Sequence, residues 1–96
     1  MKALHLVARR WFNEWTGNTY HSVRIIVDGE EVFHCPYAYG YDQQYEQTAA
    51  DWLEKNGFLK LEHYDNGGGQ TLWQYAQNKG IVYTRNVTDV LRKKDL

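Results

Sequence analysis

The chain has few of the residues that cross-link or interrupt small proteins. A single cysteine, Cys35, excludes an internal disulfide and a cysteine zinc site, and it favours a reducing compartment. A single proline, Pro36, excludes a proline-rich disordered chain. No apolar run approaches the ~18 residues that cross a bilayer, and the stretch before Arg9 is too short for a signal peptide. The four histidines show no metal-binding spacing, so we expect no metal site. Together, these absences lead us to expect a cytoplasmic protein without a cofactor or a membrane segment.

Aromatic residues are abundant. Four Trp, eight Tyr and three Phe make up 16% of the 96 residues, whereas disordered chains are poor in such rings. The length fits one domain, residues 1–96, because two independent cores need more chain. A domain so small and so rich in rings can bury further surface between two copies, so we expect a homodimer.

Charge is unevenly distributed although the net charge is only −1. Residues 1–27 and 66–96 are each basic in balance, whereas residues 28–65 hold nine acids against two lysines. If the two basic segments meet in one sheet, their positive charge would orient an anionic ligand. Charged helix faces that only contact solvent explain the same distribution without a ligand. The near-neutral total and the lack of a continuous basic stripe disfavour duplex DNA as a partner.

Alternating apolar residues in the first third of the chain predict a β-hairpin and a flanking strand. Strands are expected at residues 3–12, 19–27 and 30–35. Asp28-Gly29 favours a type I′ turn, in which both central residues need positive φ. Pro36 is expected to end the third strand, because it has no N–H to donate to a ladder. The Tyr-rich stretch at 37–41 is then expected to be a loop.

A two-residue turn also predicts the register of this hairpin. Val27 should face Glu30, and Val23 should face His34. This register places His34 on the side of the core and Phe33 on the opposite side.

Three helices are expected in the remaining chain. The expected N-terminal caps are Asp42, Thr71 and Asn86. The first helix shows one apolar stripe with Tyr45, Ala49 and Leu53, and it should end at Asn56-Gly57 in a Schellman motif. Short strands are expected at residues 58–64 and 81–85. This order predicts an α+β fold, a small and mainly antiparallel sheet with two to three helices packed on one face.

Three stretches combine residue types that recognise phosphate-bearing rings. They are Arg9, Arg10 and Trp11; Asn18, Thr19, Tyr20 and His21; and Tyr39 with Tyr41. Arginine forks onto phosphate oxygens, aromatic rings stack on bases, and a turn at residues 17–19 can offer backbone amides to an anion. We therefore expect a non-catalytic site for a small nucleotide-like or phosphate-bearing ligand. Ion pairing, core packing and strand entry are the alternative explanations of the same residues.

Two other functions agree with the sequence. The acidic segment 28–65 could present a negative surface to a nucleic-acid enzyme of the host or its defence, which would make the chain a protein inhibitor. His21 and His34, brought near each other by the predicted register, could act as the acid–base pair of a small phosphodiesterase. No catalytic spacing motif accompanies the two histidines, so they are secondary candidates.

Four motifs spread over most of the chain resemble a group of small proteins from tailed bacteriophages and prophages. They are VARRWF at 7–12, GNTYHSV at 17–23, YGY at 39–41 followed by Tyr45-x-Gln47-Thr48-Ala49, and VTDVLRKKDL at 87–96. Similar sequences have a second glycine after Tyr-Gly-Tyr, where this chain has Asp42. The resemblance implies an accessory protein in the bacterial host cytoplasm. Small phage proteins of this size commonly act by binding, as inhibitors of host or defence proteins or as traps for signalling nucleotides, so the resemblance implies a possible counter-defence role.

Overall fold

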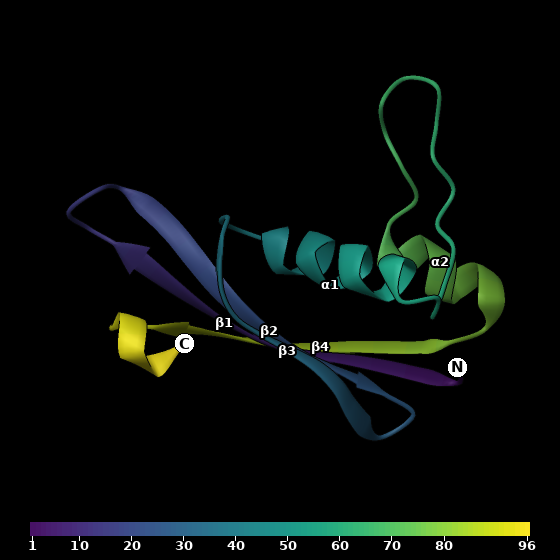
Figure 1. The fold of residues 1–96 in the computed structure, drawn as a ribbon, viewed down its shortest axis with the longest axis horizontal. Coiled ribbons are helices and arrows are strands. Elements are labelled where there is room, and N and C mark those ends of the chain that lie inside the picture. The colour runs from purple at the N-terminus through teal and green to yellow at the C-terminus, as the bar shows by residue number, and fades with distance from the viewer.

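The alternating N-terminal residues form three consecutive antiparallel strands in the computed structural model, which describes residues 1–96. The strands and helices, in chain order, are β1 (Ala3–Asn13), β2 (Asn18–Val27), β3 (Glu30–Tyr39), α1 (Gln44–Lys55), α2 (Leu72–Lys79), β4 (Val82–Val90) and the 3-10 helix η1 (Lys93–Asp95). The sheet order is β3-β2-β1-β4, and only β1 and β4 run parallel. Helices α1 and α2 lie on the same side of the sheet (Figure 1). The predicted α+β class is therefore confirmed.

The turn between β2 and β3 has the predicted conformation. Asp28 and Gly29 both have positive φ, 50° and 84°, as a type I′ turn requires. The Asp28 carboxylate also accepts hydrogen bonds from the backbone N–H groups of Lys2 and Ala3, at 2.7 and 2.9 Å. One side chain thus connects the turn to the start of β1.

The predicted end of β3 and the predicted register are both wrong. The strand continues past Pro36 to Tyr39 and contains two register shifts relative to β2. Val27 does face Glu30, but the first shift places Val23 opposite Cys35 instead of His34. Each shift inserts an extra residue into β3, and such bulges also accommodate proline within a strand.

The predicted C-terminal helix is also absent. Instead of capping a helix, Asn86 lies in the middle of β4, which pairs with β1 over its whole length. Valine and threonine are frequent in β4, and β-branched residues favour strands. The predicted strand at 58–64 is reduced to one isolated bridge between His63 and Gly69.

Both long helices keep the predicted local signals, except for one cap. Helix α1 begins after Gln43 rather than Asp42. It ends in the predicted Schellman motif, because the Phe58 N–H donates to the Leu53 carbonyl at 2.9 Å. Helix α2 begins at the predicted capping box, in which Thr71 and Gln74 exchange side-chain and backbone hydrogen bonds.

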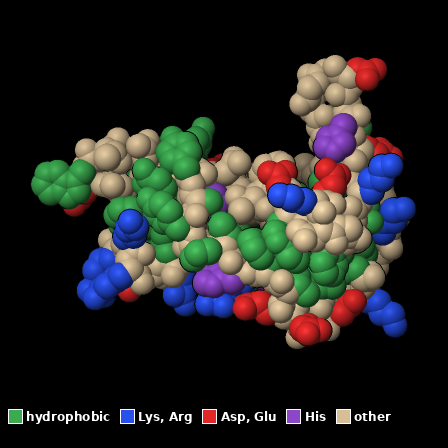
Figure 2. All heavy atoms as spheres, in the orientation of Figure 1, with side chains coloured by type: hydrophobic (Ala, Val, Ile, Leu, Met, Phe, Trp, Pro, Cys, Tyr) green, Lys and Arg blue, Asp and Glu red, His purple; other side chains and the backbone are tan.

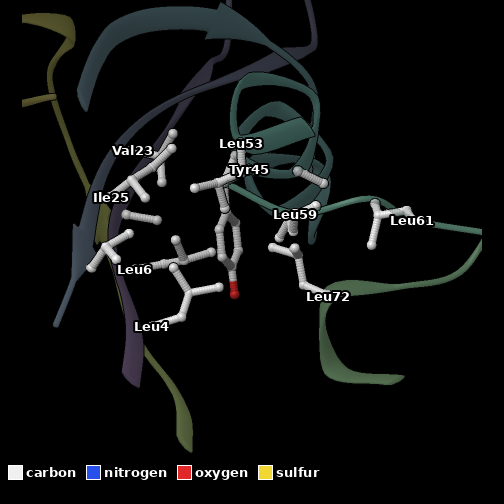
Figure 3. Packing of buried hydrophobic residues seen from close by; sticks show 13 residues of the cluster. Leu4, Leu6, Val23, Ile25, Tyr45, Leu53, Leu59, Leu61 and Leu72 are labelled. Atoms are coloured by element: carbon white, nitrogen blue, oxygen red, sulfur yellow. The ribbon is translucent and has the colours of Figure 1, made fainter. Parts of the chain in front are cut away.

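The core lies between the sheet and α1. Its strand residues alternate along β1 and β2, with Leu4 and Leu6 beside Val23 and Ile25, and they face Tyr45 and the other buried residues of α1 (Figure 3). None of the helices is long and apolar enough to cross a membrane. The opposite face of the sheet has neither α1 nor α2 against it.

Candidate functional site

Aromatic rings from three neighbouring strands meet on the sheet face opposite the helices. The Tyr20 ring stacks on Trp11, with 5.8 Å between centroids, and on Tyr37, with 4.9 Å. The Tyr39 ring meets Tyr20 edge-on at 5.6 Å. We call these four residues the aromatic column. Such cross-strand pairs stabilise a sheet, and their exposed parts can also contact a flat ligand.

One cationic side chain contacts the aromatic column, and two others hold the C-terminal segment beside it. The Lys93 ammonium lies 4.8 Å from the centroid of the Tyr37 ring, in a cation–π contact. Arg9 lies on the same face as Trp11 and donates to the carbonyl oxygen of Asp95 at 2.9 Å. Arg92 contacts the Asp95 carboxylate at 3.2 Å. The C-terminal segment is thereby held against the face that carries the rings.

A hollow of about 500 Å³ adjoins one end of the column. It is lined by Trp11, Phe12, Asn13, Glu14, Trp15, Val90, Leu91, Arg92 and Lys93. Trp15 is 93% exposed and Leu91 is 94% exposed. Figure 2 shows hydrophobic side chains, with Lys and Arg beside them, at the left end of the molecule, where Figure 1 places the β1–β2 hairpin and η1. The hollow therefore combines flat rings with two cationic side chains.

Arg10 lies on the other face of the sheet. Its guanidinium donates to the Asp89 carboxylate of β4 at 2.8 Å and to the Asp42 carbonyl at 2.9 Å. These bonds connect β1 to β4 and to the segment before α1. Arg10, predicted as a phosphate ligand, is therefore a structural ion-pair partner.

The turn after β1 uses its polar groups internally. The Gly17 N–H donates to the Asn13 carbonyl at 2.8 Å, and the Asn18 side chain accepts from the Tyr39 hydroxyl at 3.4 Å. Thr19 is on the helix-side face, and its carbonyl accepts from the Gly40 N–H at 3.0 Å. Of the predicted turn residues, only Asn18 reaches the aromatic column. Tyr41 follows the end of β3 and takes no part in it.

His21 is buried between the sheet and α1. Its Nε2 lies 2.8 Å from the Thr48 hydroxyl, and its Nδ1 lies 3.2 Å from the Gly40 carbonyl oxygen. Burial lowers the pKa of His21, although the bond to Gly40 opposes this shift. His34 lies directly across from Arg24 in the register of β2 and β3, so its side chain belongs to the opposite face of the sheet. The expected approach of the two histidines is therefore wrong, because the bulge at Val32 reverses the face to which His34 belongs.

We expect protein stability to fall with acidification below about pH 6.5, the ordinary pKa of histidine. The folded state resists protonation of His21 because its pKa is lowered, whereas the unfolded chain takes up the proton. Each pH unit between the two pKa values costs up to about 1.4 kcal/mol of unfolding free energy. Urea denaturation at a series of pH values measures this loss. His21→Gln should reduce this slope, and an unchanged slope in that variant would contradict the assignment.

Several acidic residues of the segment 28–65 form hydrogen bonds and ion pairs within the protein. Glu46 accepts hydrogen bonds from the Tyr83 hydroxyl at 2.6 Å and from Arg85 at 2.9 Å. Glu54 accepts from the Leu61 N–H at 2.8 Å, and this bond lowers the pKa of Glu54. Glu31 pairs with Arg24 across β2 and β3 at 3.0 Å. These contacts give the acidic residues a structural role and do not favour their use as an inhibitory surface.

Comparison of the chain with protein-family models, with curated proteins and with solved structures finds no match. The site must therefore be interpreted from its own geometry. Two of its residues, Arg92 and Lys93, were not predicted from the sequence as ligand contacts. Lys93 was expected at the C-terminal end of a helix, where the helix dipole alone favours a cationic side chain. Tyr37 was a candidate within the Tyr-rich stretch at 37–41, but as part of a loop, because the predicted strand ended before it.

Proposed function

We propose that this protein binds a nucleotide-like ligand on the open face of its sheet without transforming it. The planar base would pack against Trp11 in the hollow, and the phosphate would contact Arg92 and Lys93 at the rim. The single observation that supports this most is the hollow itself, which joins aromatic rings to these two cationic side chains. Its volume of about 500 Å³ is within the range of small-molecule sites.

The aromatic column supports binding of a flat group. Tyr20 is held between Trp11 and Tyr37, so its ring faces are already occupied by stacking. Trp11 is at the end of the three stacked rings and also lines the hollow. A base placed there would extend an existing stack, and such preorganisation reduces the entropy lost on binding.

The cationic side chains support an anionic group beside that base. Lys93 is already placed over Tyr37, and Arg9 holds the C-terminal segment through the Asp95 carbonyl. Arg92 keeps guanidinium N–H groups for a phosphate while its Nε contacts Asp95, because a guanidinium has five donors. The separation of His21 and His34 on opposite faces favours binding over phosphodiester cleavage. With the resemblance to phage proteins, signalling nucleotides of a bacterial host cytoplasm become the first ligands to test in a counter-defence role.

Titration with nucleotides tests this function. We expect mononucleotides, cyclic dinucleotides or cyclic trinucleotides to bind saturably in calorimetry and to raise the melting temperature. Trp11→Ala should weaken the affinity about tenfold or more, since a stacked aromatic residue contributes about 1–3 kcal/mol per base. Trp73→Ala is the matched control, because Trp73 is exposed on α2 and outside the column. A panel without any binding, or equal losses in both variants, would refute the proposal.

Replacement of cations tests the phosphate contact and the absence of chemistry. Lys93→Ala should weaken binding and reduce its dependence on salt, whereas Lys94→Ala should leave both unchanged. Chromatography of the ligand after prolonged incubation should return it intact. Enzymatic turnover that disappears in a His21→Ala variant would support the phosphodiesterase instead.

A further inference from the structure

The two edges of the sheet differ in how open they are to another strand. At one edge, β3 contains two register shifts and Pro36, features that discourage edge-to-edge pairing. At the other edge, β4 keeps one unbroken register with β1 from Val82 to Val90. Its nine residues include neither glycine nor proline. Strand β4 therefore presents a regular edge that is suited to pairing.

Alternate residues of β4 direct their backbone groups to that free edge. The Val82 N–H donates to the Lys2 carbonyl at 3.0 Å, so Val82 faces β1. In a parallel pair, the backbone N–H and C=O of every second residue point toward the same neighbour. The intervening residues, Tyr83, Arg85, Val87 and Asp89, therefore point away from β1.

We infer that β4 pairs antiparallel with β4 of a second copy of this chain, about a two-fold axis at Val87. The two four-stranded sheets would join into one sheet of eight strands, independently of any ligand. Val87 would face its own counterpart, and Arg85 would face Asp89 of the second copy on both sides of the axis. An isologous contact of this kind closes on itself and leaves no further free β4 edge.

Charge complementarity selects this register among the neighbouring ones. An axis at Arg85 would oppose two arginines, and an axis at Asp89 would oppose two aspartates. With an axis at Asn86 or Thr88, Arg85 of one copy is not opposite Asp89 of the other. Both side chains keep solvent exposure while they contact their own Glu46 and Arg10, 40% for Arg85 and 73% for Asp89. Only the axis at Val87 therefore pairs opposite charges twice.

Sedimentation equilibrium with charge variants tests both the dimer and its register. In the inferred register, Asn86 lies beside Thr88 of the second copy, and both side chains are on the open face. Asn86→Lys with Thr88→Lys would oppose two lysines at each of these contacts. Asn86→Glu with Thr88→Lys is the matched control, because the same two positions would then carry opposite charges. We expect the dissociation constant to rise about tenfold in the first variant relative to the second, which corresponds to about 1.4 kcal/mol.

Cross-linking provides a second test that does not depend on charge. Directly opposed residues of a hydrogen-bonded pair have Cα atoms about 5.5 Å apart, within the range of a disulfide. In a Cys35→Ser background, Val87→Cys should form a covalent dimer on oxidation and Val82→Cys should not. A monomer at concentrations on the order of 100 μM would overturn the dimer, because its contacts would then contribute less than about 6 kcal/mol. Cross-linking only at position 82 would overturn the register.

Discussion

Leu53→Ala is expected to lower the free energy of unfolding by about 2–5 kcal/mol, because it leaves a cavity between α1 and the sheet. Leu53 is fully buried, and it points from α1 toward the strand side chains of the core (Figure 3). Small domains have only about 5–15 kcal/mol of stability in total. The substitution should therefore leave a marginally folded protein at 25 °C.

Urea denaturation followed by circular dichroism measures this effect. Leu91→Ala removes the same atoms from a side chain that is 94% exposed, and it should change the stability by at most about 0.5 kcal/mol. Both measurements are made at low protein concentration, so that association does not contribute. Similar losses in the two variants would show that α1 does not cover the sheet as described.

Gly40→Ala is expected to cost about 1–3 kcal/mol, because Gly40 combines an unusual backbone conformation with a close approach. Its φ is +144°, and an added Cβ would lie 2.1 Å from the Cγ and 2.6 Å from the Cβ of Gln44. The residue also donates to Thr19 and accepts from His21. A displacement at this position would therefore disturb the end of β3, next to Tyr39.

The matched control for this variant is Gly57→Ala. Gly57 also has positive φ, +78°, but nothing lies within 4 Å of an added Cβ. Its replacement should therefore cost only the conformational penalty, about 1–2 kcal/mol. Thermal unfolding of both variants gives the difference that is due to the close approach. A smaller loss at Gly40 than at Gly57 would contradict the packing of Gln44 against this turn.

The parts of the fold that were predicted correctly depend on neighbouring residues. The type I′ turn follows from Asp28 and Gly29, and the start of α2 follows from Thr71 and Gln74. The buried stripe of α1 follows from helical spacing alone. Each of these signals spans only a few residues, so no distant contact was needed to interpret it.

The errors arose where distant parts of the chain decide the outcome. One extra residue at Val32 reverses the faces of the following β3 residues, and the turn gives no indication of that bulge. Asn86 carries a plausible helix-cap signal, but the free edge of β1 supplies a strand partner for the residues around it. A pairing between segments about 80 residues apart cannot be read from local propensity.

The candidate site divides in the same way. Arg9, Trp11, Tyr20 and Tyr39 were predicted from residue type, because rings beside guanidinium groups are chemically suited to a phosphate-bearing base. The strand alternation placed Arg10 and His21 on the opposite face, and the continuation of β3 added Tyr37 to the column.

By itself, the amino-acid sequence determined the fold class, the hairpin turn, the capping box of α2 and the C-terminal end of α1, since these depend on residues within a few positions of one another. The tertiary structure alone decided which rings share a face, that Lys93 lies over Tyr37, and that β4 is an open edge. The physical reason is that strand register and strand order arise from hydrogen bonds between remote segments, and a shift of one residue moves a side chain to the other side of the sheet.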